Sequence, residues 1–169
     1  MFIPSYIKLF KTGELSNRSN KLNAMLADCD ICPKDCRVNR INNEIAACYS
    51  GYNPVVSSYC VHYGEEPVLV GSKEFNNENG VGNIFFGNCN LRCVYCQNYE
   101  ISQNHKTEIK NEVTIERLAD IMLELQDKNV NAIGFVSPTH FVPQIILALE
   151  AAVSKGLRLP LVYNTNSYD

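Results

Sequence analysis

The second half of the sequence alternates short apolar runs with helix-forming segments, a pattern that few folds satisfy. The apolar runs are Ile84–Phe86, Ala132–Ser137 and Leu159–Tyr163. Between them, Thr114 can cap one amphipathic helix, and Pro143 and Gly156 stand where a second helix would begin and end. Strands that are apolar throughout are covered on both faces, and connections of this length require parallel crossovers. We therefore expect an α/β fold, either a (β/α) barrel or an open parallel sheet.

The first half of the sequence carries weaker signals. Apolar residues at near-helical spacing predict a helix over about Ser16–Ala27, and the polar stretch Val38–Ser50 predicts irregular structure. Two runs, Val55–His62 and Pro67–Val70, favour β-structure. We predict a helical, cysteine-rich lobe over residues 1–72 and a separate core over residues 73–169.

Composition and charge narrow the classes of function. A chain of 169 residues, 46% of them hydrophobic, can bury a sizeable core. A net charge of −3 lacks the excess of positive charge that attracts the nucleic-acid backbone, so no nucleic-acid partner is expected. No apolar run reaches the length of about 18 residues that a membrane span needs. The N-terminal residues also lack the apolar core and cleavage site of a secretory signal, which predicts a cytoplasmic location.

Eight cysteines are many for a cytoplasmic protein, where disulfides are disfavoured and short spacings indicate metal ligands. Three of them follow the first apolar strand with C-x3-C-x2-C spacing: Cys89, Cys93 and Cys96. Three thiolates are too few to close a four-ligand site, whereas an iron–sulfur cluster held by three cysteines keeps one iron free for another ligand. Structural zinc with His105 as a fourth ligand is the alternative.

Polar loops follow all three apolar strands. The cysteine motif comes after the first strand, SPTH (residues 137–140) after the second and NTNSYD (residues 164–169) after the third. The carboxyl ends of parallel strands meet at one edge of a sheet, and ligands collect there. These loops are therefore predicted to share one rim.

At these residues the sequence resembles the radical S-adenosylmethionine (SAM) enzymes. The spacing of Cys89, Cys93 and Cys96 is similar to their signature, and the string CQNYEIS at its end resembles the pyruvate formate-lyase activating enzyme-like branch. The segments CDICPKDCRVNR, HYGEEP, SPTHFVPQI and LPLVYNTNSYD also resemble that branch, so the likeness runs from about Cys29 to Asp169. It implies the N-terminal part of a radical-SAM partial (β/α) barrel with parallel strands, preceded by a small cysteine-rich lobe.

The resemblance also implies an activity. The three cysteines of the motif would ligate three irons of a [4Fe-4S] cluster, and the fourth iron would chelate SAM. Reductive cleavage of SAM would yield a 5′-deoxyadenosyl radical for hydrogen abstraction, which makes the chain an oxidoreductase. Tyr95 matches an aromatic position near the adenine, and Asn164 and Asn166 match polar positions near the ribose and carboxylate. Implied partners are an electron donor such as flavodoxin or ferredoxin and, as one candidate protein substrate, a glycyl-radical enzyme.

Several features depart from the family pattern. Residues 136–139 read Val-Ser-Pro-Thr where the superfamily often has a Gly-Gly-Glu element, and Ser167 stands at a glycine position. Only three core strands are predicted, about half of the usual core, and the additional cysteines precede the main motif. The alternative function is therefore a truncated, catalytically inactive fragment that binds metal or an iron–sulfur cluster, and a scaffold role is a third option.

A second group of cysteines has the ligand count of a closed tetrahedral site. It consists of Cys29, Cys32, Cys36 and Cys48, with spacing C-x2-C-x3-C-x11-C. Zinc is the simplest occupant on spacing, a second iron–sulfur cluster is the alternative, and a site without metal is the third possibility.

A few other residues have two interpretations each. His62, Glu65 and Glu66 could perform acid–base chemistry or belong to a solvated loop. His140, on the predicted rim with Thr139, could contact substrate or SAM or could brace a loop. Cys60 is expected to be a small buried hydrophobe. The charged helix face is expected to be solvated; it consists of Glu116, Arg117, Asp120 and Glu124.

Overall fold

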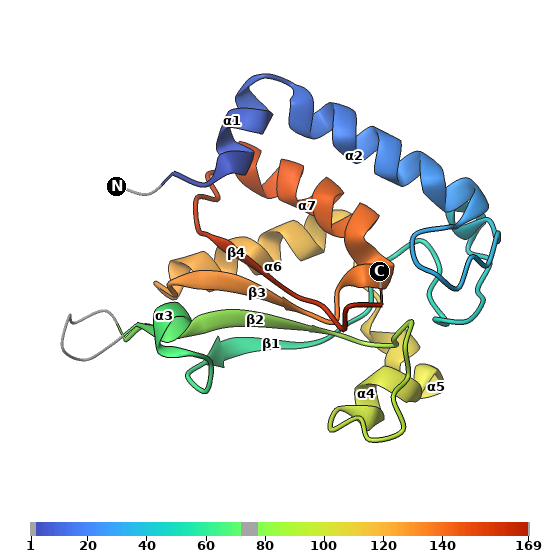
Figure 1. The fold of residues 1–169 in the computed structure, drawn as a ribbon. Coiled ribbons are helices and arrows are strands. Elements are labelled where there is room, and N and C mark those ends of the chain that lie inside the picture. Colours follow the sequence, from blue (N-terminus) through green and yellow to red (C-terminus); the bar gives the residue numbers. More distant parts are fainter. Residues whose placement is uncertain (1–2, 72–77, 169) are drawn as a thin grey trace.

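The computed structural model describes residues 3–71 and 78–168 and shows a four-stranded sheet with helices over one face (Figure 1). The strands, in spatial as well as chain order, are β1 Val56–His62, β2 Val81–Phe86, β3 Ala132–Val136 and β4 Leu161–Asn164. β2, β3 and β4 are parallel, which confirms the α/β prediction, but β1 is antiparallel to β2. β1 lies outside the three core strands that were expected to be parallel. It is antiparallel because His62 pairs with Val81, so the chain returns at the same end of the sheet and no crossover is needed.

Helices and single turns connect these strands. The α-helices are α1 Ser5–Lys11, α2 Glu14–Ala24, α3 Pro67–Val70, α4 Tyr99–Gln103, α5 His105–Glu108, α6 Ile115–Asp127 and α7 Val142–Ser154. The short 3-10 turns are η1 Met25–Asp28, η2 Arg40–Asn42, η4 Ile109–Asn111 and η5 Thr139–Phe141. None of the helices in the described residues is both long and apolar enough to cross a lipid bilayer.

The two crossover helices form where the sequence signals predict. The Thr114 side chain accepts a hydrogen bond from the Arg117 backbone N–H at 3.1 Å and so caps α6. Pro143 lies in the first turn of α7, where its missing N–H costs nothing. Leu118 and Met122 of α6 are fully buried, and each such side chain stabilises the fold by about 1.5–3 kcal/mol.

The N-terminal helices form an outer layer on α7 (Figure 1). The predicted helix over about Ser16–Ala27 is α2 followed by the turn η1. In α1, the buried Tyr6 hydroxyl donates to the Leu159 carbonyl oxygen at 2.6 Å, which ties this layer to the entry of β4, and burial raises the pKa of Tyr6 to about 12. The boundary near residue 72 between a lobe and a core lies outside the described residues and stays a prediction.

The run Pro67–Val70 is the one-turn helix α3, so the prediction of β-structure there is wrong. The Val70 N–H bonds to the Glu66 carbonyl, and proline at the first helical position has no N–H to offer a strand ladder. Val70 then packs with Val81 and Ala132, on the face of the sheet opposite α6 and α7. A short apolar run does not distinguish strand from helix.

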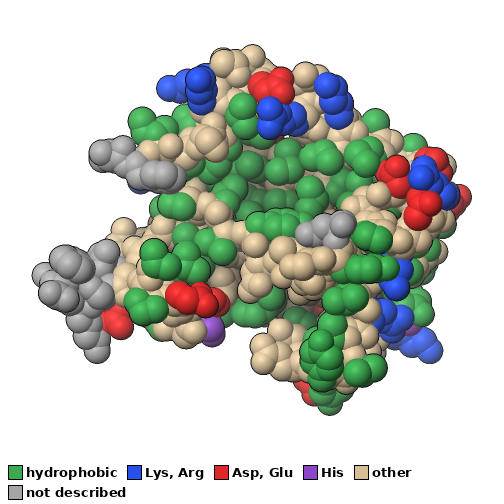
Figure 2. Space-filling view, in the orientation of Figure 1, with side chains coloured by type: hydrophobic (Ala, Val, Ile, Leu, Met, Phe, Trp, Pro, Cys, Tyr) green, Lys and Arg blue, Asp and Glu red, His purple; other side chains and the backbone are tan. Residues whose placement is uncertain are grey.

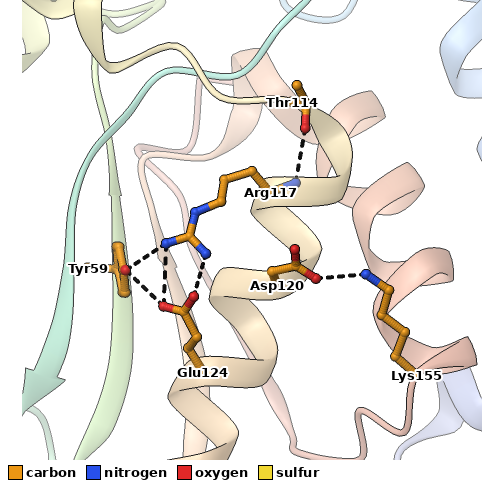
Figure 3. Close-up of polar contacts among 6 residues, drawn as sticks. All are labelled: Tyr59, Thr114, Arg117, Asp120, Glu124 and Lys155. Carbon is orange, nitrogen blue, oxygen red and sulfur yellow. Dashed lines mark hydrogen bonds and ion pairs between the residues drawn. The ribbon is translucent and has the colours of Figure 1, made fainter.

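The outer face of α6 is more than a solvated surface (Figure 3). Arg117 pairs with Glu124, and the Tyr59 hydroxyl accepts from Arg117 at 2.9 Å and donates to Glu124 at 2.8 Å. Asp120 pairs with Lys155 at 2.7 Å, beyond the end of α7. These three α6 side chains are 41–46% exposed and therefore solvated, as expected, and the exposed pairs that they form contribute only about 0–1 kcal/mol each.

β4 forms one edge of the described sheet, and hydrophobic side chains gather beside it. Figure 2 shows a green hollow between the α1 and α7 side of the molecule and the strands. A cavity of about 470 Å³ lies in this region, lined in part by Ile7, Leu159 and Pro160. The side chain of Tyr163 in β4 is 46% exposed. Apolar surface of this kind remains available for additional chain or a partner to cover.

Candidate functional site

The carboxyl ends of the three parallel strands meet at one end of the sheet. Phe85 of β2 lies opposite Val136 of β3, and Val136 lies opposite Asn164 of β4. The polar loops that follow these strands contribute residues to one cavity, as the sequence pattern predicts. This rim is therefore the place where the loops can act together.

The three cysteines of the C-x3-C-x2-C motif line this cavity, which has a volume of about 70 Å³. Cys89 is buried, and Cys93 and Cys96 are partly exposed. Ser137 from the loop after β3 and Asn166 from the loop after β4 complete part of the wall. Three thiols thus face one small space that polar side chains also reach.

Polar groups contact two of the three sulfur atoms. The Leu91 backbone N–H donates to Cys89 Sγ at 3.4 Å, and Asn166 Nδ2 donates to the same sulfur at 3.8 Å. Ser102 Oγ lies 3.3 Å from Cys96 Sγ. Such contacts stabilise the thiolate form and tune any metal that the thiolates hold.

The backbone of the cysteine loop is fixed from both sides. Asn88 and Arg92 adopt left-handed conformations, with φ of 63° and 59°, which turn the chain sharply beside Cys89. The Asn88 N–H bonds to the Ile101 carbonyl at 2.8 Å, and Gln103 Nε2 bonds to the Cys93 carbonyl at 2.9 Å. Helix α4 therefore holds the loop in place.

The donor chemistry of this loop fits a thiolate-held metal centre. Among the described residues, no three Cys, His, Asp or Glu side chains are arranged so that they could hold a metal ion as they stand. Ligation by the three cysteines therefore requires their side chains to change position within the shared cavity. His105, the alternative fourth ligand for zinc, does not line this cavity; its ring stacks on Tyr49 with centroids 4.1 Å apart.

The three residues proposed to contact SAM lie in different settings. Tyr95, between the last two cysteines, is 86% exposed. Asn164 is exposed at the end of β4, where its carbonyl oxygen accepts from the Ser137 N–H at 2.9 Å. Of the three, only Asn166 lines the cysteine cavity; it also donates to Asn90 Oδ1 at 3.0 Å.

His140 supports the start of the cysteine loop through a contact with the Gly87 backbone. The residue is 1% exposed, and its Nε2 atom lies 3.1 Å from the Gly87 carbonyl oxygen. Because a carbonyl only accepts, Nε2 carries a proton in this contact. Burial lowers the pKa of His140 to about 3, the bond to Gly87 acts in the opposite direction, and the Arg40 guanidinium lowers it further. Of the two interpretations of this residue, the geometry corresponds to loop bracing.

The other four clustered cysteines also line one cavity, with a volume of about 20 Å³. Backbone hydrogen bonds from Cys29 N–H to the Val38 carbonyl and from Arg37 N–H to the Cys29 carbonyl, both 3.0 Å, fold this segment back on itself. Burial raises the pKa of the Cys48 thiol above its ordinary value, and the Arg40 guanidinium opposes that rise. The cysteines concerned are Cys29, Cys32, Cys36 and Cys48.

The HYGEEP segment lies at the opposite end of the sheet from the cysteine rim. His62 Nδ1 and Asn83 Nδ2 are 3.0 Å and 2.7 Å from Glu65 Oε1. His62 pairs with the first residue of β2, whereas the cysteine loop follows the last. Cys60 is exposed, so the expectation that it is a buried hydrophobe is wrong: its side chain projects from β1, an edge strand of the described sheet, on the side away from α6.

Sequence reasoning passed over three polar residues that shape the cysteine site. Asn88 is buried and bonds to the Tyr49 carbonyl at 3.0 Å, and Asn90 is buried and bonds to the Tyr168 carbonyl at 3.0 Å. Ser102 is the third. Two of them could have been found from the sequence, because Asn88 and Asn90 flank Cys89. An asparagine buried beside a cysteine loop must hydrogen-bond to other parts of the chain.

Comparison with known proteins gives one family match. The family model for the radical SAM superfamily matches residues 83–169, which include all three polar loops of the rim, the cysteine loop among them. No solved structure matches the chain.

Three curated proteins are similar to parts of the chain. Uncharacterized protein MJ0674 of Methanocaldococcus jannaschii is 32% identical over 151 residues, 83% of this chain and 39% of that protein. Uncharacterized protein MJ0808 of the same organism is 31% identical over 111 residues, 61% of this chain and 33% of that protein. A phosphoribosyl-AMP cyclohydrolase of Methanoregula boonei is 32% identical over 75 residues, 44% of this chain and 54% of that protein. The chain therefore spans well under half of the length of the two Methanocaldococcus relatives.

Proposed function

This chain belongs to the radical SAM superfamily, and on that premise we propose that Cys89, Cys93 and Cys96 hold a [4Fe-4S] cluster that binds and cleaves SAM. The observation that carries the proposal is the single cavity on the strand rim that all three thiols line together with Asn166. When bound, the cluster would supply one electron to the sulfonium of SAM, with release of methionine and a 5′-deoxyadenosyl radical that abstracts hydrogen from a substrate. Three protein ligands leave one metal position open, which is the requirement for chemistry at the cluster.

The chain's own residues would hold and tune this centre. The N–H groups of Leu91 and Asn166 donate to Cys89 Sγ, so they favour its thiolate and the added negative charge of a reduced cluster. Asn164 and Asn166 on the rim would meet the polar groups of SAM, and the exposed ring of Tyr95 would contact its adenine. The buried face of the loop, formed around Asn88 and Asn90, keeps water from one side of the site.

The finer identity of the reaction is part of the same proposal. An oxidoreductase of the pyruvate formate-lyase activating enzyme-like branch would receive its electron from flavodoxin or ferredoxin and act on a glycyl-radical enzyme. A reducing, cytoplasmic location belongs to the same proposal and is supported by cysteines at the short spacings of metal ligands. The division into an N-terminal cysteine-rich lobe, residues 1–72, and a core of residues 73–169 stays part of the proposal, although β1 of the first part pairs with β2 of the second in one sheet.

Anaerobic reconstitution with iron and sulfide tests the central claim. We expect the wild-type chain to bind iron and, after reduction with dithionite in the presence of SAM, to release 5′-deoxyadenosine, measured by mass spectrometry. Cys93→Ala should abolish both signals, whereas the matched control Cys60→Ser, an exposed cysteine outside the cavity, should retain them. Iron binding that survives Cys93→Ala and Cys96→Ala would refute the ligand assignment.

A second candidate function is a cluster-binding chain that does not catalyse by itself. The observation that favours it is the partly exposed β4 edge and the hydrophobic hollow beside it (Figure 2), which additional chain would cover in a larger barrel. In that case the same assay would show bound iron but no 5′-deoxyadenosine. Restored cleavage in a longer version of the protein would separate this outcome from a complete absence of radical chemistry.

A further inference from the structure

Arg40 is buried without a carboxylate partner. The residue is 2% exposed, its Nε donates to the Gly51 carbonyl at 3.0 Å, and its Nη1 donates to the His140 carbonyl at 2.7 Å. Its Nη2 has no hydrogen-bond partner. Within residues 3–71 and 78–168, no Asp or Glu forms an ion pair with it.

A charge in this position requires a nearby anion. Arginine does not lose its proton in proteins, and an uncompensated buried ion costs several kcal/mol. Carbonyl oxygens satisfy hydrogen bonds but do not neutralise charge. The guanidinium lines the cavity of the four clustered cysteines, and Nη1 lies 4.0 Å from Cys29 Sγ. Neutral thiols would not offset the charge, whereas thiolates would.

We propose that Cys29, Cys32, Cys36 and Cys48 bind one zinc ion as thiolates, and that Arg40 is the cation that stabilises this site. Four thiolates around Zn²⁺ carry a net charge of −2, and zinc binding to four thiols releases four protons. The guanidinium, which is itself 2% exposed, offsets part of that negative charge. This site is separate from the rim cavity, and the proposal does not depend on the proposed function.

The present size of the cavity favours a single ion over a cluster. A volume of about 20 Å³ is close to the space that one water molecule occupies by the same measure, whereas the cavity of the C-x3-C-x2-C loop has about 70 Å³. A cubane of eight iron and sulfide atoms needs more room than one ion. The thiols do not yet stand at ligating positions, so we expect their side chains to turn inward when zinc binds.

The chain around these cysteines has the form of a metal-binding loop. The left-handed residues Asp35 and Arg37 reverse the backbone, and the Asp35 N–H bonds to the Cys32 carbonyl at 3.0 Å. Apart from the η2 turn, residues 29–55 form no regular structure, and a short segment without its own core gains stability from a bound metal. The contact from Arg40 to His140, and from His140 to Gly87, joins this segment to the loop that carries Cys89.

Metal analysis of a rim-site variant tests the occupant. In the triple variant Cys89→Ser, Cys93→Ser and Cys96→Ser, purified anaerobically with iron and zinc supplied, we expect about one zinc per chain and no iron. Zinc-edge X-ray absorption should show four sulfur ligands at about 2.3 Å. Iron with sulfide in this variant, no bound metal, or nitrogen and oxygen ligands would each overturn the proposal, and none of these outcomes bears on the rim cluster.

Variants of Arg40 test its role as the charge partner. Arg40→Met should weaken zinc binding by about 10–100-fold in a chelator competition, because the metal ligands lose a partner that stabilises them. The same variant should release zinc at a higher pH than the wild type. Arg40→Lys keeps the charge and should retain most of the affinity. The matched control Arg18→Met removes an exposed arginine of α2 that pairs with Glu14 outside the cysteine loop, and should change affinity by less than about 2-fold. Equal losses in Arg40→Met and Arg40→Lys, or no loss in Arg40→Met, would overturn the charge-partner role.

Discussion

Replacing His140 with glutamine should remove an acid-sensitive part of the protein's stability. In the folded chain, the neutral ring of His140 is buried and donates to the Gly87 carbonyl. A glutamine side chain can still donate a hydrogen bond to that carbonyl, but it does not titrate. The substitution therefore separates the ionisation of His140 from its role as a brace.

The magnitude follows from the two pKa values of His140. The ordinary pKa is 6.5, and burial lowers the pKa to about 3 in the folded chain. Between these values the unfolded chain binds one proton more than the folded chain, so the free energy of unfolding increases with pH. The stabilisation is complete well above pH 6.5 and is lost as the pH falls toward 3. Between pH 8 and pH 5 the loss amounts to about 2 kcal/mol.

Urea unfolding followed by circular dichroism at several pH values measures this loss. We expect the free energy of unfolding of His140→Gln to fall by about 2 kcal/mol less than that of the wild type between pH 8 and pH 5. Both chains receive the same treatment with chelator, so that acid release of metal from cysteines contributes equally to each.

His140→Phe provides the control for the hydrogen bond. It should show the same weakened pH dependence as His140→Gln, with an additional cost at pH 8 of about 1–3 kcal/mol, because the Gly87 carbonyl loses its donor. An equal acid-induced loss of stability in the wild type and in His140→Gln would refute the reasoning, since the ring would then not be held neutral by burial.

Three further substitutions test other contacts. Asn166→Leu removes the N–H donor to Cys89 Sγ, so the reduction potential of a reconstituted cluster should fall by roughly 40 mV, the equivalent of one hydrogen bond of about 1 kcal/mol, in a titration followed by EPR; an unchanged or higher potential would contradict this. Gly134→Ala would place a methyl group against Asn83 Oδ1 and should cost about 1–3 kcal/mol in urea unfolding, and a fully stable variant would show that Asn83 moves freely. Cys60→Ser, on an exposed side chain, should change the free energy of unfolding by less than about 0.5 kcal/mol and leave the metal content unchanged; a larger effect would mean that Cys60 is buried or ligates metal.

Local spacing explains which features of this protein were predictable. The crossover helices depend on a cap at Thr114, a proline at the start of α7 and apolar residues at helical intervals, and all of these act within a few residues. The shared rim follows in turn from parallel strands, since each strand must end at the same edge. The cysteine motif was equally visible because its three cysteines lie within eight residues of one another.

The features that failed prediction depend on distant parts of the chain. Pro67–Val70 reads as a strand by composition but forms a helix that packs on Val81 and Ala132. Cys60 is exposed because β1 lies at an edge of the described sheet, and Arg117 binds Tyr59 across 58 residues. The residues next to Cys60 and Arg117 in the sequence reveal neither the edge position of β1 nor the contact with Tyr59.

By itself, the sequence determined the α/β class, the rim and the three cysteines of the superfamily signature, because each is encoded in short-range periodicity or spacing. Only the tertiary structure decided that β1 runs antiparallel, that His140 supports the loop of Cys89, and that Arg40 lies buried beside Cys29. These contacts join residues up to about a hundred positions apart. Burial gives them their energetic weight, and burial is a property of the packed chain and not of any one segment.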